Sequence, residues 1–173
     1  LPSSSGLTIK SLEIESPVLQ LHAVGSWQSV NGESSTRLQG EASSTKVSDV
    51  LTAWGFDSTN FVGGKGDVKF DLIWPDVPFH PTEKGLGGSL SLRLGEGRIV
   101  DIGESEAKMG FGKLLSVLSL QNIPRRLSFN FSDLTEKGYS FDSITGDVKF
   151  AKGSAFTDNL RILGPVADIK ISG

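Results

Sequence analysis

The sequence predicts a mainly β protein built on an antiparallel curved sheet, and three observations support this class. Apolar and polar residues alternate with a period of two along most of the chain, which is typical of strands with one buried face. Glycine accounts for 21 of 173 residues, well above its ~7% average share, and it is spread along the chain. Only two segments have helical spacing. We therefore expect about ten or eleven strands and two short helices, at about 46–55 and 110–122.

The N-terminal third predicts four strands with irregular alternation. Their sequences are LTIKSLEI (7–14), VLQLHAV (18–24), SWQSV (26–30) and STRLQGEA (35–42).

The middle of the chain alternates more regularly, in GDVKFDLIW (66–74) and GSLSLRL (88–94). A turn at Gly95-Glu96-Gly97 then predicts a hairpin into a partner strand that carries Ile99 and Ile102. The stretch WPDVPFHP (74–81) holds three prolines and predicts an extended surface loop. The apolar faces of the two strands consist of Val68, Phe70, Leu72 and Trp74 in the first, and Leu90, Leu92 and Leu94 in the second.

Four further strands are expected in the C-terminal third: LSFNFS (127–132), GDVKF (146–150), FTDNLRI (156–162) and VADIKIS (166–172). The pentapeptide GDVKF also occurs at 66–70, which weakly favours a repeating β unit.

The two helical segments differ in how much polar surface they carry. In 46–55, Val47, Val50, Leu51 and Trp54 share one side, Ser48 is the expected N-cap and Gly55 the stop. In 110–122 the apolar stripe covers more than half of the circumference, and Pro124 ends the helix. We expect this second helix to be covered on most sides.

Composition and motifs exclude several classes of function. The net charge of −3 argues against nucleic-acid binding, and the absence of cysteine excludes disulfides and cysteine-based zinc sites. No apolar run is long enough to span a membrane, and the opening LPSSSG, without an initiator Met, suggests a section of a longer protein.

We also expect no enzymatic activity, no metal and no cofactor. The only histidines, His22 and His80, have no serine–aspartate setting around them, and no G-x-S-x-G motif is present. The sequence GGKGD at 63–67 lacks the Ser or Thr of a phosphate-binding loop and precedes a strand, so it predicts a turn.

The apolar residues themselves have two interpretations. They fill a closed core, or they line a groove that meets an apolar ligand, and alternation alone does not separate the two. Of the three tryptophans, Trp54 and Trp74 are expected in the core, and only Trp27 is free to be exposed, as a carbohydrate-binding module would require.

The C-terminal part resembles a known family. The residues GKLLSVLSLQNIPRRL, then FSDLTEKGYSFDSITGD, then the ordered run from Gly153 to Gly173 resemble the YhdP family of AsmA-like proteins of Gram-negative bacteria. Upstream, VSDVLTAWGF, GGKGDVKFDLIWPDVP and LGGSLSLRLGEGRI are similar in kind and order. The resemblance is best over 45–173, and residues before about 45 share only the strand pattern.

This resemblance implies a bridge-like lipid transfer protein. Such proteins are anchored in the inner membrane and extend through the periplasm, and their β-sheet curls into a taco-like groove with an apolar floor. They are implicated in moving phospholipid to the outer membrane and thereby in its permeability barrier. The resemblance thus implies that 1–173 is a single section of this β-groove, periplasmic and non-enzymatic, with phospholipid acyl chains as its partner.

As a hypothesis, twelve residues line the groove: Phe70, Leu72, Leu90, Leu92, Leu114, Leu115, Leu118, Leu127, Phe129, Phe131, Ile169 and Ile171. Arg125 and Arg126 are candidates for contact with the lipid phosphate. Open strand edges would also permit self-association. The alternatives are a closed β-sandwich that binds a glycan or a protein, and a structural spacer in the envelope.

Overall fold

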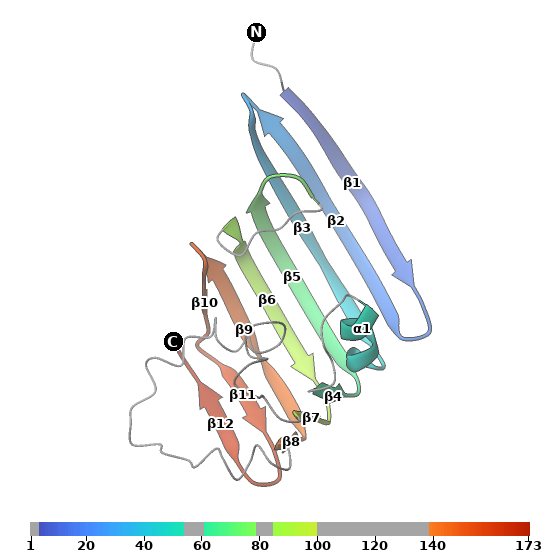
Figure 1. Ribbon diagram of the computed structural model, residues 1–173, viewed down its shortest axis with the longest axis vertical. Helices are drawn as coiled ribbons and strands as arrows, with labels where there is room; N and C mark the ends of the chain where they lie inside the picture. Colours follow the sequence, from blue (N-terminus) through green and yellow to red (C-terminus); the bar gives the residue numbers. More distant parts are fainter. Residues whose placement is uncertain (1–3, 54–60, 79–84, 100–138) are drawn as a thin grey trace.

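The computed structural model describes residues 4–53, 61–78, 85–99 and 139–173. In these residues, twelve strands form two antiparallel sheets, and there is one helix (Figure 1). The strands are β1 (Ser4–Glu15), β2 (Leu19–Val30), β3 (Glu33–Ser44), β4 (Phe61–Gly63), β5 (Gly66–Pro75), β6 (Gly87–Leu94), β7 (Gly97–Ile99), β8 (Tyr139–Phe141), β9 (Ser143–Ala151), β10 (Ser154–Phe156), β11 (Leu160–Leu163) and β12 (Asp168–Ile171), and the helix is α1 (Val47–Ala53).

The larger sheet has the strand order β1-β2-β3-β5-β6-β9-β11-β12, and β10 pairs with β9 outside this path. Its two end strands, β1 and β12, are not paired with each other, so the sheet described here is open. The smaller sheet has the order β4-β7-β8. The prediction of a mainly β, antiparallel fold is confirmed.

Two tight turns explain why strands that follow each other along the chain also pair with each other. Asn31 and Gly32, between β2 and β3, have φ values of 54° and 85°, and Lys152 and Gly153, between β9 and β10, have 52° and 74°. Two consecutive residues with positive φ make the type I′ turn, whose twist matches that of antiparallel strands. Register along β2 and β3 then continues without interruption from Val30↔Glu33 to Leu19↔Ser44.

The prediction of separate strands at 18–24 and 26–30 is wrong, because β2 runs through Gly25. This glycine pairs with Leu38 of β3. A Cβ on Gly25 would lie 2.6 Å from the carbonyl oxygen of Arg37. The glycine therefore permits a close approach of two strands and does not mark a turn.

The predicted hairpin after 88–94 is also wrong, because β7 does not pair with β6. Its partners are β4 and β8 in the smaller sheet. The turn is instead bonded to the segment before β5, through Gly95 N to Lys65 O (2.9 Å) and Gly64 N to Glu96 O (3.2 Å). These bonds direct the chain out of the larger sheet.

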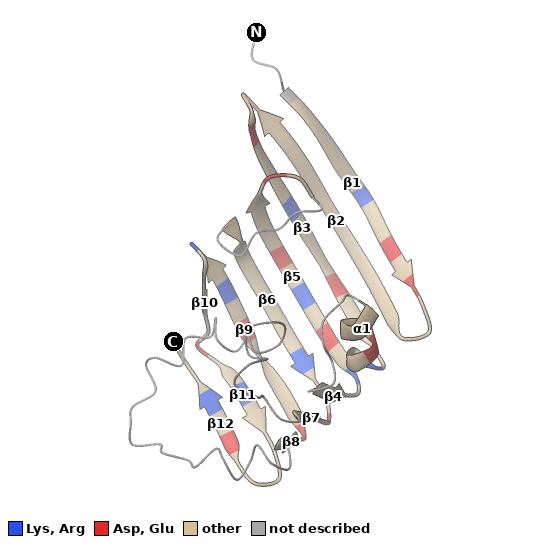
Figure 2. Cartoon of the chain, in the orientation of Figure 1, with Lys and Arg blue, Asp and Glu red and all other residues tan. Residues whose placement is uncertain are grey.

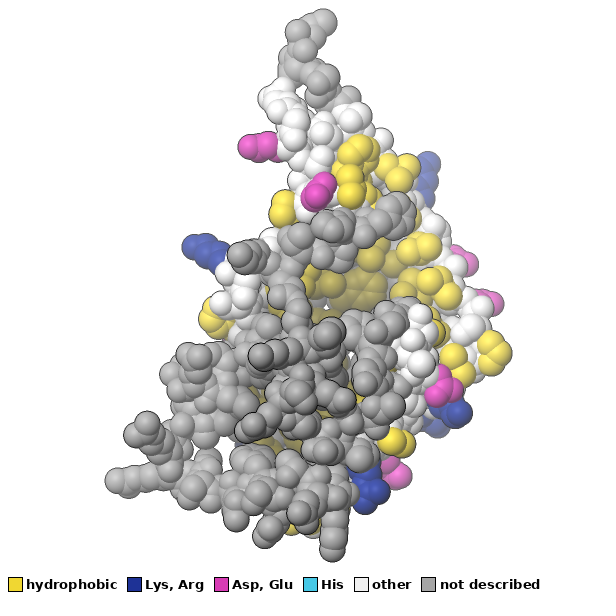
Figure 3. Space-filling view, in the orientation of Figure 1, with side chains coloured by type: hydrophobic (Ala, Val, Ile, Leu, Met, Phe, Trp, Pro, Cys, Tyr) yellow, Lys and Arg dark blue, Asp and Glu magenta, His cyan; other side chains and the backbone are white. Residues whose placement is uncertain are grey.

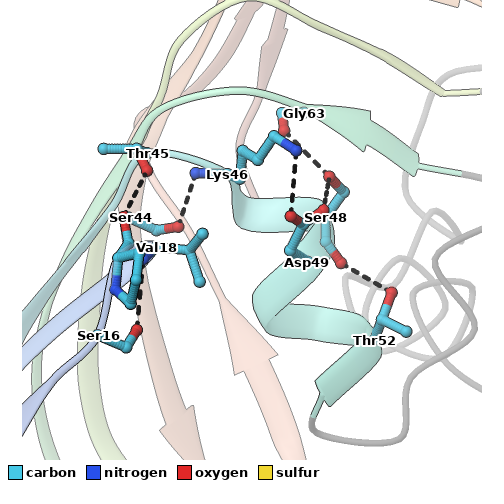
Figure 4. A network of polar contacts seen from close by, with 10 residues as sticks. Ser16, Val18, Ser44, Thr45, Lys46, Ser48, Asp49, Thr52 and Gly63 are labelled. Carbon is cyan, nitrogen blue, oxygen red and sulfur yellow. Dashed lines mark hydrogen bonds and ion pairs between the residues drawn. The ribbon is translucent and has the colours of Figure 1, made fainter.

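The first helix is confirmed, but its start differs from the expected one. The carbonyl of Lys46 accepts bonds from Asp49 N (3.1 Å) and Val50 N (3.3 Å), so Ser48 lies within α1 and is not its N-cap. Val47 N and the Ser48 hydroxyl instead bond to the carbonyls of Gly64 (2.9 Å) and Gly63 (3.4 Å), as Figure 4 shows for Ser48. These bonds tie the helix to the end of β4.

The strand count exceeds the prediction because β4, β8 and β10 have three residues each, too few to show alternation. In the proline-rich stretch 74–81, Trp74 and Pro75 belong to β5, and Pro75 pairs with Ser35 only at the end of that strand. The helix expected at 110–122, the strand expected at 127–132 and Gly55 lie outside the described residues.

Candidate functional site

Strand register assembles the apolar residues into one continuous face of the larger sheet. Residues paired across antiparallel strands lie on the same side of the sheet, so each row of partners can be followed from strand to strand. One row consists of Leu12, Ala23, Gly40, Phe70, Leu90 and Val148, and the next of Ile14, Leu21, Ala42, Val68, Leu92 and Gly146. We call this side, from Leu7 on β1 to Ile171 on β12, the apolar face.

The opposite side, which we call the polar face, carries the charges. One of its rows consists of Glu13, His22, Glu41, Lys69, Ser91 and Asp147. Acidic and basic positions lie beside each other on neighbouring strands (Figure 2), with ion pairs such as Lys69–Glu41 (3.6 Å) and Arg37–Asp71 (2.7 Å). A depression on the described surface lies here, with Glu13 and Glu15 of β1 and Arg93 of β6 in its lining.

The apolar face offers very little hydrogen bonding. In the described strands no charged residue belongs to a row of this face. Thr36, which lies on it, donates its hydroxyl to the carbonyl of Asp76 (2.8 Å). The indole Nε1 of Trp27 is buried without a partner in the described structure. A ligand on this face would therefore meet mainly hydrocarbon.

Coverage of the apolar face changes from one edge of the sheet to the other. On β1, Leu7, Leu12 and Ile14 are 54%, 37% and 40% exposed. On β9, Ile144 and Val148 are each only 6% exposed. In Figure 3, which looks onto this face, hydrophobic side chains gather on the sheet and line a hollow over its middle. The face thus combines an open region and a packed region.

The packed region is a hydrophobic cluster between the two sheets. Phe61 of β4 and Phe141 of β8, each 2% exposed, stack with ring centroids 6.0 Å apart. They pack with Ile144 and Leu160 of the larger sheet. Around these four, which we call the Phe61–Phe141 cluster, lie Val47, Leu51, Leu92, Leu94, Ile99, Ile162 and Ile171.

The predicted groove residues are divided between these regions. Phe70, Leu72 and Leu90 lie half-buried on the apolar face and are not among the residues that pack on the cluster. Leu92 and Ile171 pack against the cluster, and Ile169 pairs with Ile162 beside it. The remaining predicted site residues, Leu114, Leu115, Leu118, Arg125, Arg126, Leu127, Phe129 and Phe131, lie outside the described residues.

The exposed apolar residues of β1 were not predicted as part of the site. The register between β1 and β2 shifts between Ile9 and Leu12, so Leu7 and Ile9 on one side of this bulge share a face with Leu12 and Ile14 on the other. A bulge changes the parity of the alternation. The bulge therefore interrupts the period-two alternation in residues 7–14, although the sequence shows several aliphatic residues there.

The two described tryptophans, Trp27 and Trp74, do not form an exposed platform. Trp74 is 6% exposed, as expected for a core residue, and its Nε1 donates to Val77 O (3.1 Å). Trp27, which we expected to be free to be exposed, is half-buried on the apolar face opposite Leu7 and Thr36. Trp54 lies outside the described residues.

The carboxyl groups with shifted pKa values lie on the polar face of the described sheet. The hydrogen bond from Arg37 lowers the pKa of Asp71, and the bond from Arg161 lowers the pKa of Asp168. His22 is exposed, with Nδ1 3.7 Å from Glu13. Within residues 4–53, 61–78, 85–99 and 139–173, no three metal-ligating side chains gather, and no helix has the length and apolar character needed to cross a membrane.

Comparison with known proteins agrees with this geometry. Among curated proteins, the chain is similar to the intermembrane phospholipid transporter YhdP of Escherichia coli (strain K12), with 31% identity over 171 residues. The match covers 99% of this chain and 13% of that protein, and no solved structure matches. The family model described as YhdP protein matches residues 1–173. The chain therefore belongs to the YhdP family.

Proposed function

We propose that residues 1–173 form one non-enzymatic section of a phospholipid transporter, whose apolar face receives the acyl chains of the lipid. The section belongs, in this proposal, to a groove that spans the periplasm, in a parent protein anchored in the inner membrane. Phospholipid moves along it to the outer membrane and supports the permeability barrier there. The headgroup stays in water, with Arg125 and Arg126 as candidate contacts for its phosphate.

The observation that carries this proposal is the partly exposed apolar face on the back of a charged sheet. Exposure of Leu7, Leu12 and Ile14 to water does not stabilise an edge strand. Each methylene group removed from water contributes about 0.8 kcal/mol, so an acyl chain on this face is held without any specific polar contact. Intermembrane phospholipid transport, the function for which the related protein is named, requires such a ligand.

Two other functions remain as alternatives. A sandwich that binds a glycan needs hydrogen-bonding groups beside an aromatic ring, and the apolar face has few. A structural spacer is favoured by the Phe61–Phe141 cluster, which closes part of the face as a protein core does. A spacer, however, has no need for the exposed leucines of β1.

The free edge of β1 also supports self-association. This strand has twelve residues and pairs only with β2 among the described strands. Its other edge has no partner among the described strands, and a strand of a second copy can bond the backbone groups there.

The proposal can be tested by changing one face of the sheet at a time. Leu12 and Val24 have nearly equal exposure, 37% and 39%, but Leu12 belongs to the apolar face and Val24 to the polar face. We expect wild-type protein and Val24→Asp to extract phospholipid from vesicles of phosphatidylethanolamine and phosphatidylglycerol, and Leu12→Asp to extract several-fold less. Mass spectrometry of the re-isolated protein measures the bound lipid. Equal extraction by the two variants, or none by wild type, contradicts the proposal.

A further inference from the structure

The Phe61–Phe141 cluster has a second feature besides its burial: the small sheet lies very close over it. Gly63 of β4 pairs with Gly97 of β7, and Gly97 pairs with Phe141 of β8. A Cβ on Gly63 would collide with the ring of Phe61, and a Cβ on Gly97 with the ring of Phe141. The two rings therefore occupy the space that side chains at these glycines would otherwise fill.

Between the described strands of the two sheets, this packing leaves no passage for a hydrocarbon chain. Carbon atoms in contact are about 3.5–4.0 Å apart, so an acyl chain needs a gap of roughly twice that distance. The stacked rings lie directly on Ile144 and Leu160 of the larger sheet. α1 closes the adjoining side, because a Cβ on Gly66 of β5 would meet both Val47 and Leu94.

The part of the apolar face outside the cluster is nevertheless wide enough for one acyl chain. The four strands β1, β2, β3 and β5 are consecutive in the sheet. At about 4.8 Å between neighbours they span roughly 14 Å, close to the ~15 Å that one leaflet contributes to a bilayer core of ~30 Å.

We propose that the Phe61–Phe141 cluster is a stop that ends the lipid-accessible part of the apolar face. Acyl chains lie over β1, β2, β3 and β5, and they do not continue beneath β4, β7 and β8 toward β12. This inference rests on the proposed function and adds a direction to it, because the face is open at β1 and closed at the opposite end. Lipid that reaches the stop leaves the face sideways.

Photo-crosslinking tests where the acyl chain stops. The full chain is mixed with phosphatidylethanolamine vesicles that contain a phospholipid with a diazirine near the end of one acyl chain, and the adducts are mapped by mass spectrometry. We expect adducts on apolar-face residues of β1, β2, β3 and β5, such as Leu12 and Phe70, and none on Phe61, Phe141 or Leu160. Adducts on those three residues in wild-type protein overturn the stop. Absence of adducts anywhere contradicts the proposed function instead.

Two variants show whether the rings are the cause. Phe141→Ala should extend the adducts to Ile144 and Leu160, whereas Val62→Ala, at a 57%-exposed position of β4, should leave the map unchanged. Circular dichroism and thermal melting establish that each variant is folded. If folded Phe141→Ala gives the wild-type map, the rings are not the stop. The wild-type map decides the proposal even where Phe141→Ala does not fold.

Discussion

At the scale of single residues, the two described tryptophans show how the apolar face differs from an ordinary core. Trp74 satisfies its indole N–H through the carbonyl of Val77, whereas the buried Nε1 of Trp27 has no partner in the described structure. An unpaired buried donor costs about 1–3 kcal/mol. Trp27 thus contributes apolar surface to the face and no net hydrogen-bond stability.

We therefore expect Trp74→Phe to destabilise the protein by about 1–2 kcal/mol more than Trp27→Phe. Both substitutions remove the same atoms, and the deeper burial of Trp74 acts in the same direction as its hydrogen bond. Urea unfolding measures the two free energies of unfolding. A larger loss at Trp27 would contradict this assignment.

The charged pair of Arg37 and Asp71 makes stability depend on pH in a defined direction. Arg37 Nε and Nη2 donate to the two carboxylate oxygens of Asp71 at 2.9 and 2.7 Å, which lowers the pKa of Asp71 below its ordinary 3.8. The folded state therefore binds the proton less tightly than the unfolded state. Its contribution to stability is complete above pH 3.8 and is lost as the pH falls through the lowered pKa.

Asp71→Asn should accordingly lower the urea midpoint at pH 7, only slightly because exposed pairs contribute little, and its effect should shrink as the pH falls below 3.8. The double variant with Arg37→Gln provides the control, since the effect of Asp71→Asn should nearly vanish once Arg37 is absent. An effect of Asp71→Asn that grows toward acid would contradict the sign.

At the scale of elements, the small sheet is held to the large one by the Phe61–Phe141 cluster. Removing a buried phenylalanine ring costs about 3–5 kcal/mol. We expect this loss for Phe141→Ala, and less than about 1 kcal/mol for Phe156→Ala, because Phe156 is 48% exposed. Calorimetric melting of both variants checks the difference. Similar losses would show that the cluster does not hold the sheets together.

The glycines of the small sheet predict a second difference. Gly97→Ala places its Cβ against the ring of Phe141 and 2.8 Å from Val62 O, so overpacking of about 1–3 kcal/mol is expected. At Gly64 the nearest atom to an added Cβ is Glu96 O at 3.5 Å, so Gly64→Ala should be tolerated. Urea unfolding of both variants measures this contrast. Equal stability of the two variants would mean that the Phe141 ring moves aside freely.

Which elements could be predicted from sequence depends on their length. Alternation over the stretches 66–74 and 88–94 identified β5 and β6 and the face on which Phe70 and Leu90 lie. Strands of three residues, such as β4 and β8, carry no comparable pattern, and their pairing with β7 depends on the long-range contact of Phe61 with Phe141. The glycine at 25 was ambiguous, because close approach and turn formation both favour this residue.

At the scale of the whole molecule, alternation identified an apolar face but not what covers it. Leu90 and Leu92 have the same sequence pattern, yet only Leu92 packs against the cluster. The β-bulge in β1 hid the most exposed part of the site, at Leu7 and Leu12. Whether an apolar residue is covered depends on tertiary packing. Groove-lining residues can therefore be distinguished from core residues only when the positions of the small sheet and α1 are known.

The most direct test of the central claim compares the two faces of the sheet in one NMR sample. A phospholipid with a nitroxide near the end of its acyl chain is added in vesicles, and line broadening of the exposed methyl groups is measured. On the apolar face these are Leu7, Leu12 and Ile14, and on the polar face Val24, Val30 and Ile73, with similar exposure in both sets. Lipid on the apolar face predicts stronger broadening of the first set than of the second. Equal broadening of both sets, or of neither, contradicts the account.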